Sequence, residues 1–180
     1  IFFMIGALRR MKESVEKTYT GDLKQGKVVG TQLNERTVGI IGYGHIGQVV
    51  AKLLQPFGPK IIIYTHKTTT PKLLGKNIEY ETDIKAFFRR VDIITLHCPL
   101  TPETEYLINE EHLQLMPKGS IIINTARGKI VETEAMLNEL DNGHIAFYAT
   151  DVYEHEGRVF HHQFQTLNEI EDELFKRLIQ

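Results

Sequence analysis

Residues 37–50 read Thr37-Val38-Gly39-Ile40-Ile41-Gly42-Tyr43-Gly44-His45-Ile46-Gly47-Gln48-Val49-Val50, an apolar strand that runs into a three-glycine turn and an amphipathic helix. In such a turn Gly42 allows the tight bend, Gly44 lets the backbone approach a phosphate, and Gly47 lets the helix pack closely on the strand. The amides of His45, Ile46 and Gly47 begin the helix without an intrahelical partner, so they favour an anion. The stretch predicts a site for a dinucleotide pyrophosphate; the competing interpretation is a close-packed turn without a ligand.

The choice between nicotinamide cofactors depends on a position about 20 residues further on, at the end of the next strand. That strand, Lys60 to Tyr64, leads into Thr65-His66-Lys67, and no Asp or Glu is present. A carboxylate there would bind the ribose hydroxyls of NAD and repel the extra phosphate of NADP. Thr65 removes that repulsion, and Lys67 would add a compensating charge unless it is only a solvated loop residue. We expect NAD as the cofactor, with NADP tolerated.

The composition excludes several classes of protein. With 180 residues, 42% of them hydrophobic, the chain can bury a core of its own. Lys and Arg number 21 against 23 Asp and Glu, with no basic block, which argues against a nucleic-acid partner. The single cysteine, Cys98, excludes an internal disulfide and fits a reducing compartment, and no Cys or His spacing suggests a metal site.

The first residues bear on targeting. The apolar run Ile1 to Ile5 is too short to span a bilayer, and Arg9 and Arg10 follow it rather than precede it, so we expect neither a signal sequence nor a membrane anchor. The expected location is cytoplasmic. Because the chain starts with Ile rather than Met, we expect it to be a fragment.

Helical and strand patterns alternate along the chain. Helical spacing or flanking signals predict helices over 2–17, 46–55, 84–88, 110–116, 132–141 and 169–179. Apolar runs predict further strands over 61–64, 77–81, 92–97, 120–124 and 145–150, and residues 18–36 form a long, glycine-punctuated loop. This alternation predicts an α/β fold with a doubly wound parallel sheet of the Rossmann type, whose ligands bind at the carboxyl ends of the strands.

Residues that can carry chemistry follow the later strands, and four segments stand out: Gly42-Tyr43-Gly44-His45-Ile46-Gly47, His97-Cys98-Pro99-Leu100-Thr101-Pro102-Glu103-Thr104, Asn124-Thr125-Ala126-Arg127-Gly128 and Asp151-Val152-Tyr153-Glu154-His155-Glu156. In order and spacing they resemble the D-isomer-specific 2-hydroxyacid dehydrogenases, specifically the nucleotide-binding domain, from about Gly30 to Glu156. The resemblance implies hydride transfer between a nicotinamide cofactor and a 2-oxo or 2-hydroxy acid. It also implies a linking helix and arm at 1–36, an NAD(P)-binding domain at 37–156, and the start of a return to an absent substrate domain at 157–180.

The resemblance assigns roles to single residues. Arg127 matches the arginine that binds the substrate carboxylate and polarises its carbonyl, which suits a guanidinium fork; a surface salt bridge is the alternative. Glu156 matches the carboxylate that raises the pKa of a catalytic histidine; the alternative is a solvated loop acid. Asp151 matches the residue beside the nicotinamide, against a helix-cap or turn role. The expected cofactor-binding set is Gly42, Gly44, His45, Ile46, Gly47, Thr65, Cys98, Pro99, Thr104, Thr125, Ala126, Arg127 and Asp151. We expect Cys98 to pack rather than to act as a nucleophile, because nothing nearby in sequence would activate it.

The chain departs from the family at the proton donor. The family histidine lies beyond the glutamate in a Pro-His or Gly-His segment, whereas His161 and His162 are too close to Glu156 to match it. We therefore expect these residues to bind cofactor at best and to turn over poorly or not at all. The tail after Glu156 leads into an acidic helix, which resembles the D-lactate dehydrogenase branch and favours pyruvate and D-lactate as substrates. Family members commonly dimerise through this domain, so we expect a homodimer that uses residues 2–36.

Two other functions compete with the dehydrogenase. A nucleotide-sensing binding protein on the same scaffold needs no turnover, but the retained Arg127 and Glu156 weigh against it. A methyltransferase-like domain also binds its cofactor, S-adenosylmethionine, at a glycine-rich turn. It would not require Arg127, Asp151 and Glu156 together.

Overall fold

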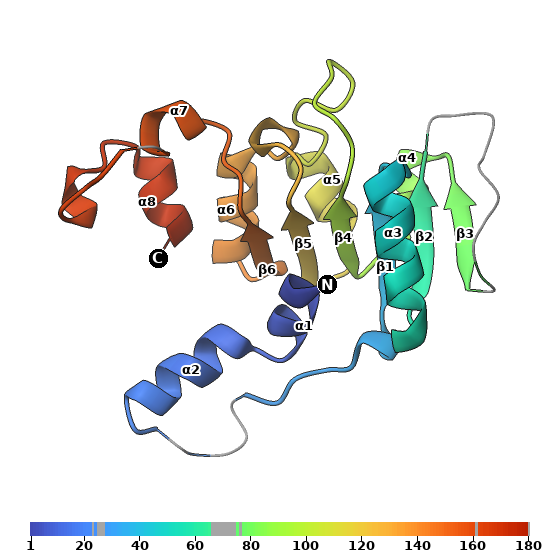
Figure 1. Ribbon diagram of the computed structural model, residues 1–180, viewed down its shortest axis with the longest axis horizontal. Helices are drawn as coiled ribbons and strands as arrows, with labels where there is room; N and C mark the ends of the chain where they lie inside the picture. Colours follow the sequence, from blue (N-terminus) through green and yellow to red (C-terminus); the bar gives the residue numbers. More distant parts are fainter. Residues whose placement is uncertain (23, 25–27, 66–74, 76, 161, 180) are drawn as a thin grey trace.

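The computed structural model describes residues 1–22, 24, 28–65, 75, 77–160 and 162–179. Within these residues six strands form one sheet, in the order β3-β2-β1-β4-β5-β6 (Figure 1). All neighbouring strands pair in parallel, which confirms the predicted doubly wound sheet. The strands are β1 (Thr37–Ile41), β2 (Lys60–Tyr64), β3 (Ile78–Glu81), β4 (Ile93–Leu96), β5 (Ser120–Asn124) and β6 (Ile145–Thr150).

The sheet is buried on both faces, which explains the isoleucine runs of its central strands. On one face Ile62, Ile94 and Ile122 pack under α4 (Ile84–Arg90), α5 (Glu110–Leu115) and α6 (Thr133–Asp141). On the other face the alternate residues Ile61, Ile63, Ile93 and Ile121 pack under α1 (Phe2–Leu8) and α3 (His45–Leu54). Side chains of Asp83 and Asn109 accept backbone amides at the starts of α4 and α5 and set where those helices begin.

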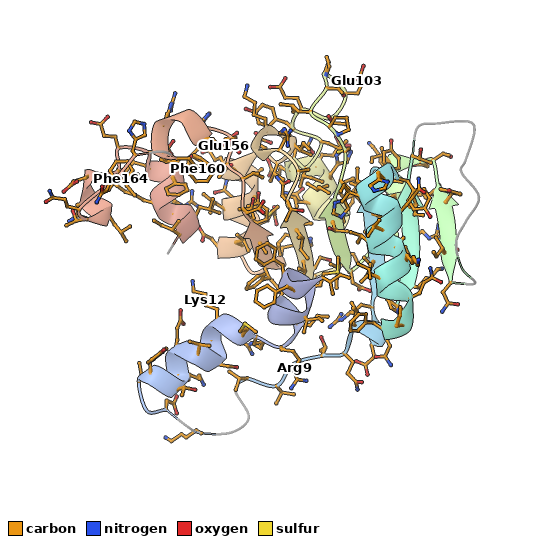
Figure 2. The ribbon with its side chains drawn as sticks, viewed as in Figure 1. Arg9, Lys12, Glu103, Glu156, Phe160 and Phe164 are labelled. Carbon is orange, nitrogen blue, oxygen red and sulfur yellow. The ribbon has the colours of Figure 1, made fainter. Side chains whose placement is uncertain are left out.

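The N-terminal segment corrects the prediction of a single helix over 2–17. It forms two helices, α1 and α2 (Met11–Tyr19), separated at Arg10, whose φ is 50°. The Leu8 carbonyl accepts the amide of Thr31 at 3.0 Å, so the returning arm occupies an acceptor that a continuous helix would use. Helix α1 buries Met4, Ala7 and Leu8, whereas α2 buries no residue and extends away from the sheet (Figure 1). Arg9 and Lys12 mark the junction in Figure 2.

The C-terminal segment also differs from its prediction. The helix expected over 169–179 is shorter: α8 covers Glu173–Ile179, and the short 3₁₀ turn η4 (Leu167–Glu169) precedes it. A further helix, α7 (Glu156–Val159), begins at the predicted catalytic glutamate. The remaining 3₁₀ turns are η1 (Leu33–Glu35), η2 (Gln55–Phe57) and η3 (Gly128–Ile130). Tyr153, Val159 and Ile170 form a small core of their own, so the tail packs beside the end of β6.

Candidate functional site

The glycine turn lies between β1 and α3, at the carboxyl edge of the sheet. Gly42 has a φ of +95°, and a Cβ there would lie 2.6 Å from the Cys98 amide nitrogen. A Cβ on Gly47 would overlap the Gly42 carbonyl oxygen, because the helix is held tightly on the turn. Packing therefore requires glycine at both positions.

Gly44 differs from the other two glycines. It is exposed, its φ of −77° suits any residue, and a Cβ there would meet no atom of the described residues within 4 Å. No side chain of the described residues caps the start of α3, whose first turn follows Gly44 directly. Nothing within the described chain requires glycine at this position, whereas an anion seated on the first amides of α3 would require close backbone approach. The turn thus fits a phosphate better than it fits the interpretation of a close-packed turn without a ligand.

A cavity of about 370 Å³ adjoins this turn, at the carboxyl ends of β1, β2 and β4. Its lining is largely apolar, which suits the flat face of a base together with a sugar. It brings together six residues of the expected cofactor-binding set: Gly42, Gly44, Thr65, Cys98, Pro99 and Thr104. The other described residues of the lining are Ile41, Tyr43, Tyr64, His97 and Leu107.

His97 and Cys98 stay uncharged at neutral pH in this cavity. The imidazole Nε2 of His97 lies 2.9 Å from the Thr95 hydroxyl, and burial lowers its pKa to about 4. Burial likewise raises the pKa of the Cys98 thiol to about 11. A protonated thiol is a poor nucleophile, which supports a packing role for Cys98.

A buried amide fixes the backbone that carries Arg127. Asn124 ends β5 with no exposed surface, and its side chain both donates to the Arg127 carbonyl at 2.9 Å and accepts the Ala126 amide at 3.1 Å. The Arg127 side chain is exposed, and its Nη1 donates to the Ala126 carbonyl at 2.6 Å. Our sequence-based site omitted Asn124, although a polar residue at the end of an otherwise apolar strand was a signal for it.

A second cavity, of about 430 Å³, contains both predicted catalytic residues. Arg127 lines it from the loop after β5. Glu156, which is labelled in Figure 2, lines it from the start of α7. The Glu156 carboxylate accepts the Tyr153 amide at 3.2 Å. The other lining residues are Leu100, Gly128, Lys129, Tyr153, Glu154, His155, Gly157 and Arg158.

Gly128 holds the two loops of this cavity against each other. A Cβ at Gly128 would overlap the carbonyl group of Tyr153 and the amide of Glu154. Only glycine lets the segment after β5 approach the segment after β6 so closely. Gly128 thus sets the separation of Arg127 from Glu156, a role that its place in the sequence motif did not reveal.

Some predicted site residues lie outside these two cavities. Asp151 is exposed and lines a different, largely apolar cavity beside β6, together with Phe160 and Leu178. Five further residues of the expected set line neither the glycine-turn cavity nor the Arg127 cavity: His45, Ile46, Gly47, Thr125 and Ala126. They lie on the helix and loop that border them.

Comparison with known proteins identifies the family. The family model described as "D-isomer specific 2-hydroxyacid dehydrogenase, NAD binding domain" matches residues 1–172. The chain belongs to the D-isomer-specific 2-hydroxyacid dehydrogenase family.

Its similarity to individual dehydrogenases of this family extends over most of the chain. It is 35% identical over 158 residues to a D-lactate dehydrogenase from Lactobacillus delbrueckii subsp. bulgaricus, with 88% of this chain and 47% of the relative covered. It is 38% identical over 162 residues to a glyoxylate reductase from Thermococcus kodakarensis, with 85% and 48% covered. The NAD-complexed crystal structure of a D-isomer specific 2-hydroxyacid dehydrogenase from L. delbrueckii ssp. bulgaricus superposes with a TM-score of 0.86 at 32% identity, covering 98% of this chain and 53% of that one. The chain spans about half the length of these relatives.

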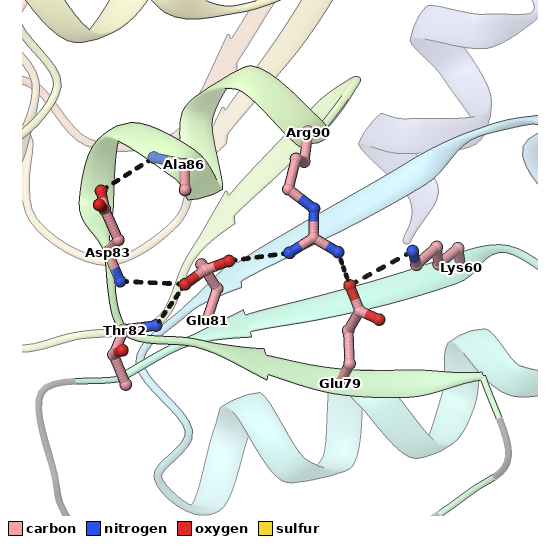
Figure 3. Close-up of polar contacts among 7 residues, drawn as sticks. All are labelled: Lys60, Glu79, Glu81, Thr82, Asp83, Ala86 and Arg90. Carbon is pink, nitrogen blue, oxygen red and sulfur yellow. Dashed lines mark hydrogen bonds and ion pairs between the residues drawn. The ribbon is translucent and has the colours of Figure 1, made fainter.

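In dinucleotide-binding folds a residue at the end of the second strand discriminates NAD from NADP. Here the end of β2 has acidic neighbours on β3. The Thr65 amide donates to the Glu81 carbonyl at 3.4 Å; Lys67 lies outside the described residues. The Glu81 carboxylate accepts the amides of Asp83 and Thr82 and pairs with Arg90 at 2.8 Å (Figure 3). These hydrogen bonds, that of Asp83 foremost, hold the pKa of Glu81 below its usual range.

The same arginine extends this network along β3. Arg90 also pairs with Glu79, which Lys60 approaches at 3.3 Å (Figure 3). The two β3 carboxylates are therefore matched by cations. Their negative charge near the end of β2 is thus largely compensated.

Two other kinds of feature are absent from the described residues. No helix among them has both the length and the apolar character needed to cross a membrane. No group of three or more His, Cys, Asp or Glu side chains in this part of the chain is placed to hold a metal ion.

Proposed function

We propose that this chain forms the cofactor-binding part of an oxidoreductase that transfers a hydride between a nicotinamide cofactor and a D-2-hydroxy acid or 2-oxo acid. The observation that carries the proposal is the position of Arg127 and Glu156 in one cavity, next to the glycine-turn cavity. A pure nucleotide sensor has no need for an arginine and a carboxylate that share a cavity. The family match supports the same reaction class.

In the proposed reaction the chain binds and orients its substrate. The Arg127 guanidinium pairs with the substrate carboxylate and polarises the adjacent carbonyl, so that negative charge developing on that oxygen is stabilised. Glu156 would face the family's proton-donating histidine, which is not among these 180 residues, and would raise the pKa of that histidine. The nicotinamide, when bound, supplies or accepts the hydride. Because no histidine of this chain matches the family position, we propose that the 180 residues alone bind cofactor and turn over poorly or not at all.

For the substrate we propose pyruvate and D-lactate, because the segment that follows Glu156 resembles the D-lactate dehydrogenase branch. The relatives named above include both a D-lactate dehydrogenase and a glyoxylate reductase, so membership of the family alone does not choose between them. The proposed organisation is a linking helix and arm at 1–36, the nucleotide-binding domain at 37–156 and a connecting segment at 157–180. The single, half-buried Cys98 supports a cytoplasmic location.

Cofactor titration separates the proposed function from its competitors. We expect NADH and NADPH both to bind, with affinities within about tenfold of each other, because Thr65 stands where a carboxylate would repel the 2′-phosphate. S-adenosylmethionine should not bind. Fluorescence titration with the three ligands measures this directly, and binding of S-adenosylmethionine alone would favour a methyltransferase. Reduction of 2-oxo acids by the complete encoded protein distinguishes a dehydrogenase from a sensor.

We also propose that the protein is a homodimer and that α2 contributes to its interface. Met11, Val15 and Tyr19 lie four residues apart on one face of α2, with exposures of 43%, 47% and 88%. Symmetric dimers are the commonest oligomers, and this apolar face is uncovered in the single chain. Sedimentation velocity at micromolar concentration should show a dimer for the complete protein and a weakened one for Val15→Glu. A monomer across that range would contradict the proposal.

A further inference from the structure

Tyr153 links the tail of the chain to the Arg127 and Glu156 cavity. Its side chain is 3% exposed and packs in the small core that contains Val159 and Ile170. Its hydroxyl donates to Asp172 Oδ1 at 2.7 Å. The same oxygen accepts the Phe175 amide at 3.0 Å, so Asp172 also caps the start of α8.

The backbone of Tyr153 contacts the loops that carry the two proposed catalytic residues. Its amide donates to the Glu156 carboxylate at 3.2 Å. Its carbonyl group lies against Gly128, the residue that follows Arg127 in the chain. A shift of Tyr153 therefore moves Glu156 and the Arg127 loop relative to each other.

The hydrogen bond between Tyr153 and Asp172 persists over a wide pH range. Burial and the bond to Asp172 raise the pKa of Tyr153, so its hydroxyl stays protonated and keeps donating. Burial alone would raise the pKa of Asp172, but the Tyr153 hydroxyl and the Phe175 amide outweigh it and hold that pKa below its usual value. The other carboxylate oxygen of Asp172 is buried without a hydrogen-bond partner in the described chain, so the Tyr153 hydroxyl is a main compensation for this charge.

We propose that Tyr153 and Asp172 are a positioning pair, which uses α8 to hold Glu156 at a fixed place relative to Arg127. The inference rests on the proposed function and deepens it. It gives the segment after α7 a role in positioning Glu156, beyond connecting this domain to the rest of the protein. In this proposal both residues act through Glu156 and the Arg127 loop.

Tyr153→Phe tests the pair, because it keeps the ring in its core and removes only the hydroxyl. In the complete encoded protein we expect kcat for 2-oxo acid reduction to fall about 3- to 10-fold, with the NADH affinity unchanged. A misplaced Glu156 stabilises the protonated histidine less, so the alkaline limb of the kcat/KM profile should move to lower pH. Asp172→Ala should behave alike, whereas Asp172→Asn retains an acceptor and a helix cap and should restore the profile.

The matched control is Asp141→Ala. Asp141 pairs with Arg177 of α8 at 2.5 Å, so this variant also removes a contact of α8 but does not touch Tyr153. It should leave the pH profile unchanged. If Tyr153→Phe lowers only the unfolding temperature and leaves the profile as in the wild type, the pair is merely structural and the inference is wrong.

A second readout needs no turnover. The carboxylate ¹³C resonance of Glu156, assigned with Glu156→Gln, should shift in Tyr153→Phe and Asp172→Ala but not in Asp141→Ala. An unchanged resonance overturns the inference whether or not the protein reduces 2-oxo acids. A shifted resonance in a protein without reductase activity keeps the positioning pair and overturns the proposed function.

Discussion

Arg127→Gln should lower kcat/KM for 2-oxo acid reduction by about 10³-fold, while NADH binds as in the wild type. The variant removes the charge that would hold the substrate carboxylate and stabilise the developing oxyanion, and loss of one such donor costs about 10² to 10³ in rate. Arg127 would serve both tasks, which places the effect at the upper end. Its side chain is exposed and Asn124 holds its backbone, so the fold should tolerate the change. Steady-state kinetics of the complete encoded protein measure the loss.

Arg89→Gln is the matched control for this variant. Arg89 is exposed in the last turn of α4 and lines neither cavity, so its replacement should leave kcat/KM within about twofold. If Arg127→Gln behaves like Arg89→Gln, Arg127 is a surface residue. The proposed reaction would then lose its substrate anchor.

The second large effect is expected at Gly47. In Gly47→Ala the new Cβ overlaps the Gly42 carbonyl oxygen, and backbone on both sides cannot move without separating α3 from β1. We expect a loss of about 3 kcal/mol in the free energy of unfolding, at the upper end for overpacking in a well-packed core. NADH affinity should fall with it because the first turn of α3 moves. Chemical denaturation and cofactor titration measure the two effects.

Gly44→Ala provides the contrast within the same turn. Its Cβ meets no atom within 4 Å and its φ of −77° suits alanine, so stability should change by no more than about 0.5 kcal/mol. NADH affinity should nevertheless drop at least about tenfold, because a Cβ there keeps a pyrophosphate from the backbone. Normal NADH binding by Gly44→Ala would show that the phosphate sits elsewhere. Loss of binding without loss of stability is a result that only a ligand cradle explains.

The central fold was predictable because its signals are local or compositional. Runs such as Ile61 to Ile63 are apolar on both faces, which only a strand covered by helices on each side can bury. The glycine turn and the alternation of strands and helices then determine the doubly wound order. The N-terminal helix was predicted wrongly for the opposite reason. Its break depends on the Thr31 amide that binds the Leu8 carbonyl, a contact between segments that helical spacing cannot register.

The same distinction between local signals and contacts of distant segments holds for the candidate site. The sequence predicts Gly42, Gly44 and Gly47, with Arg127 and Glu156, as site residues because each stands in a motif of fixed spacing just beyond a strand. The sequence by itself determined which chemical groups reach the carboxyl edge of the sheet, since parallel strands all end there. The distance between those groups was decided by tertiary structure alone. It depends on Gly128 against Tyr153 and on Tyr153 against Asp172, contacts between distant segments whose close packing no local pattern encodes.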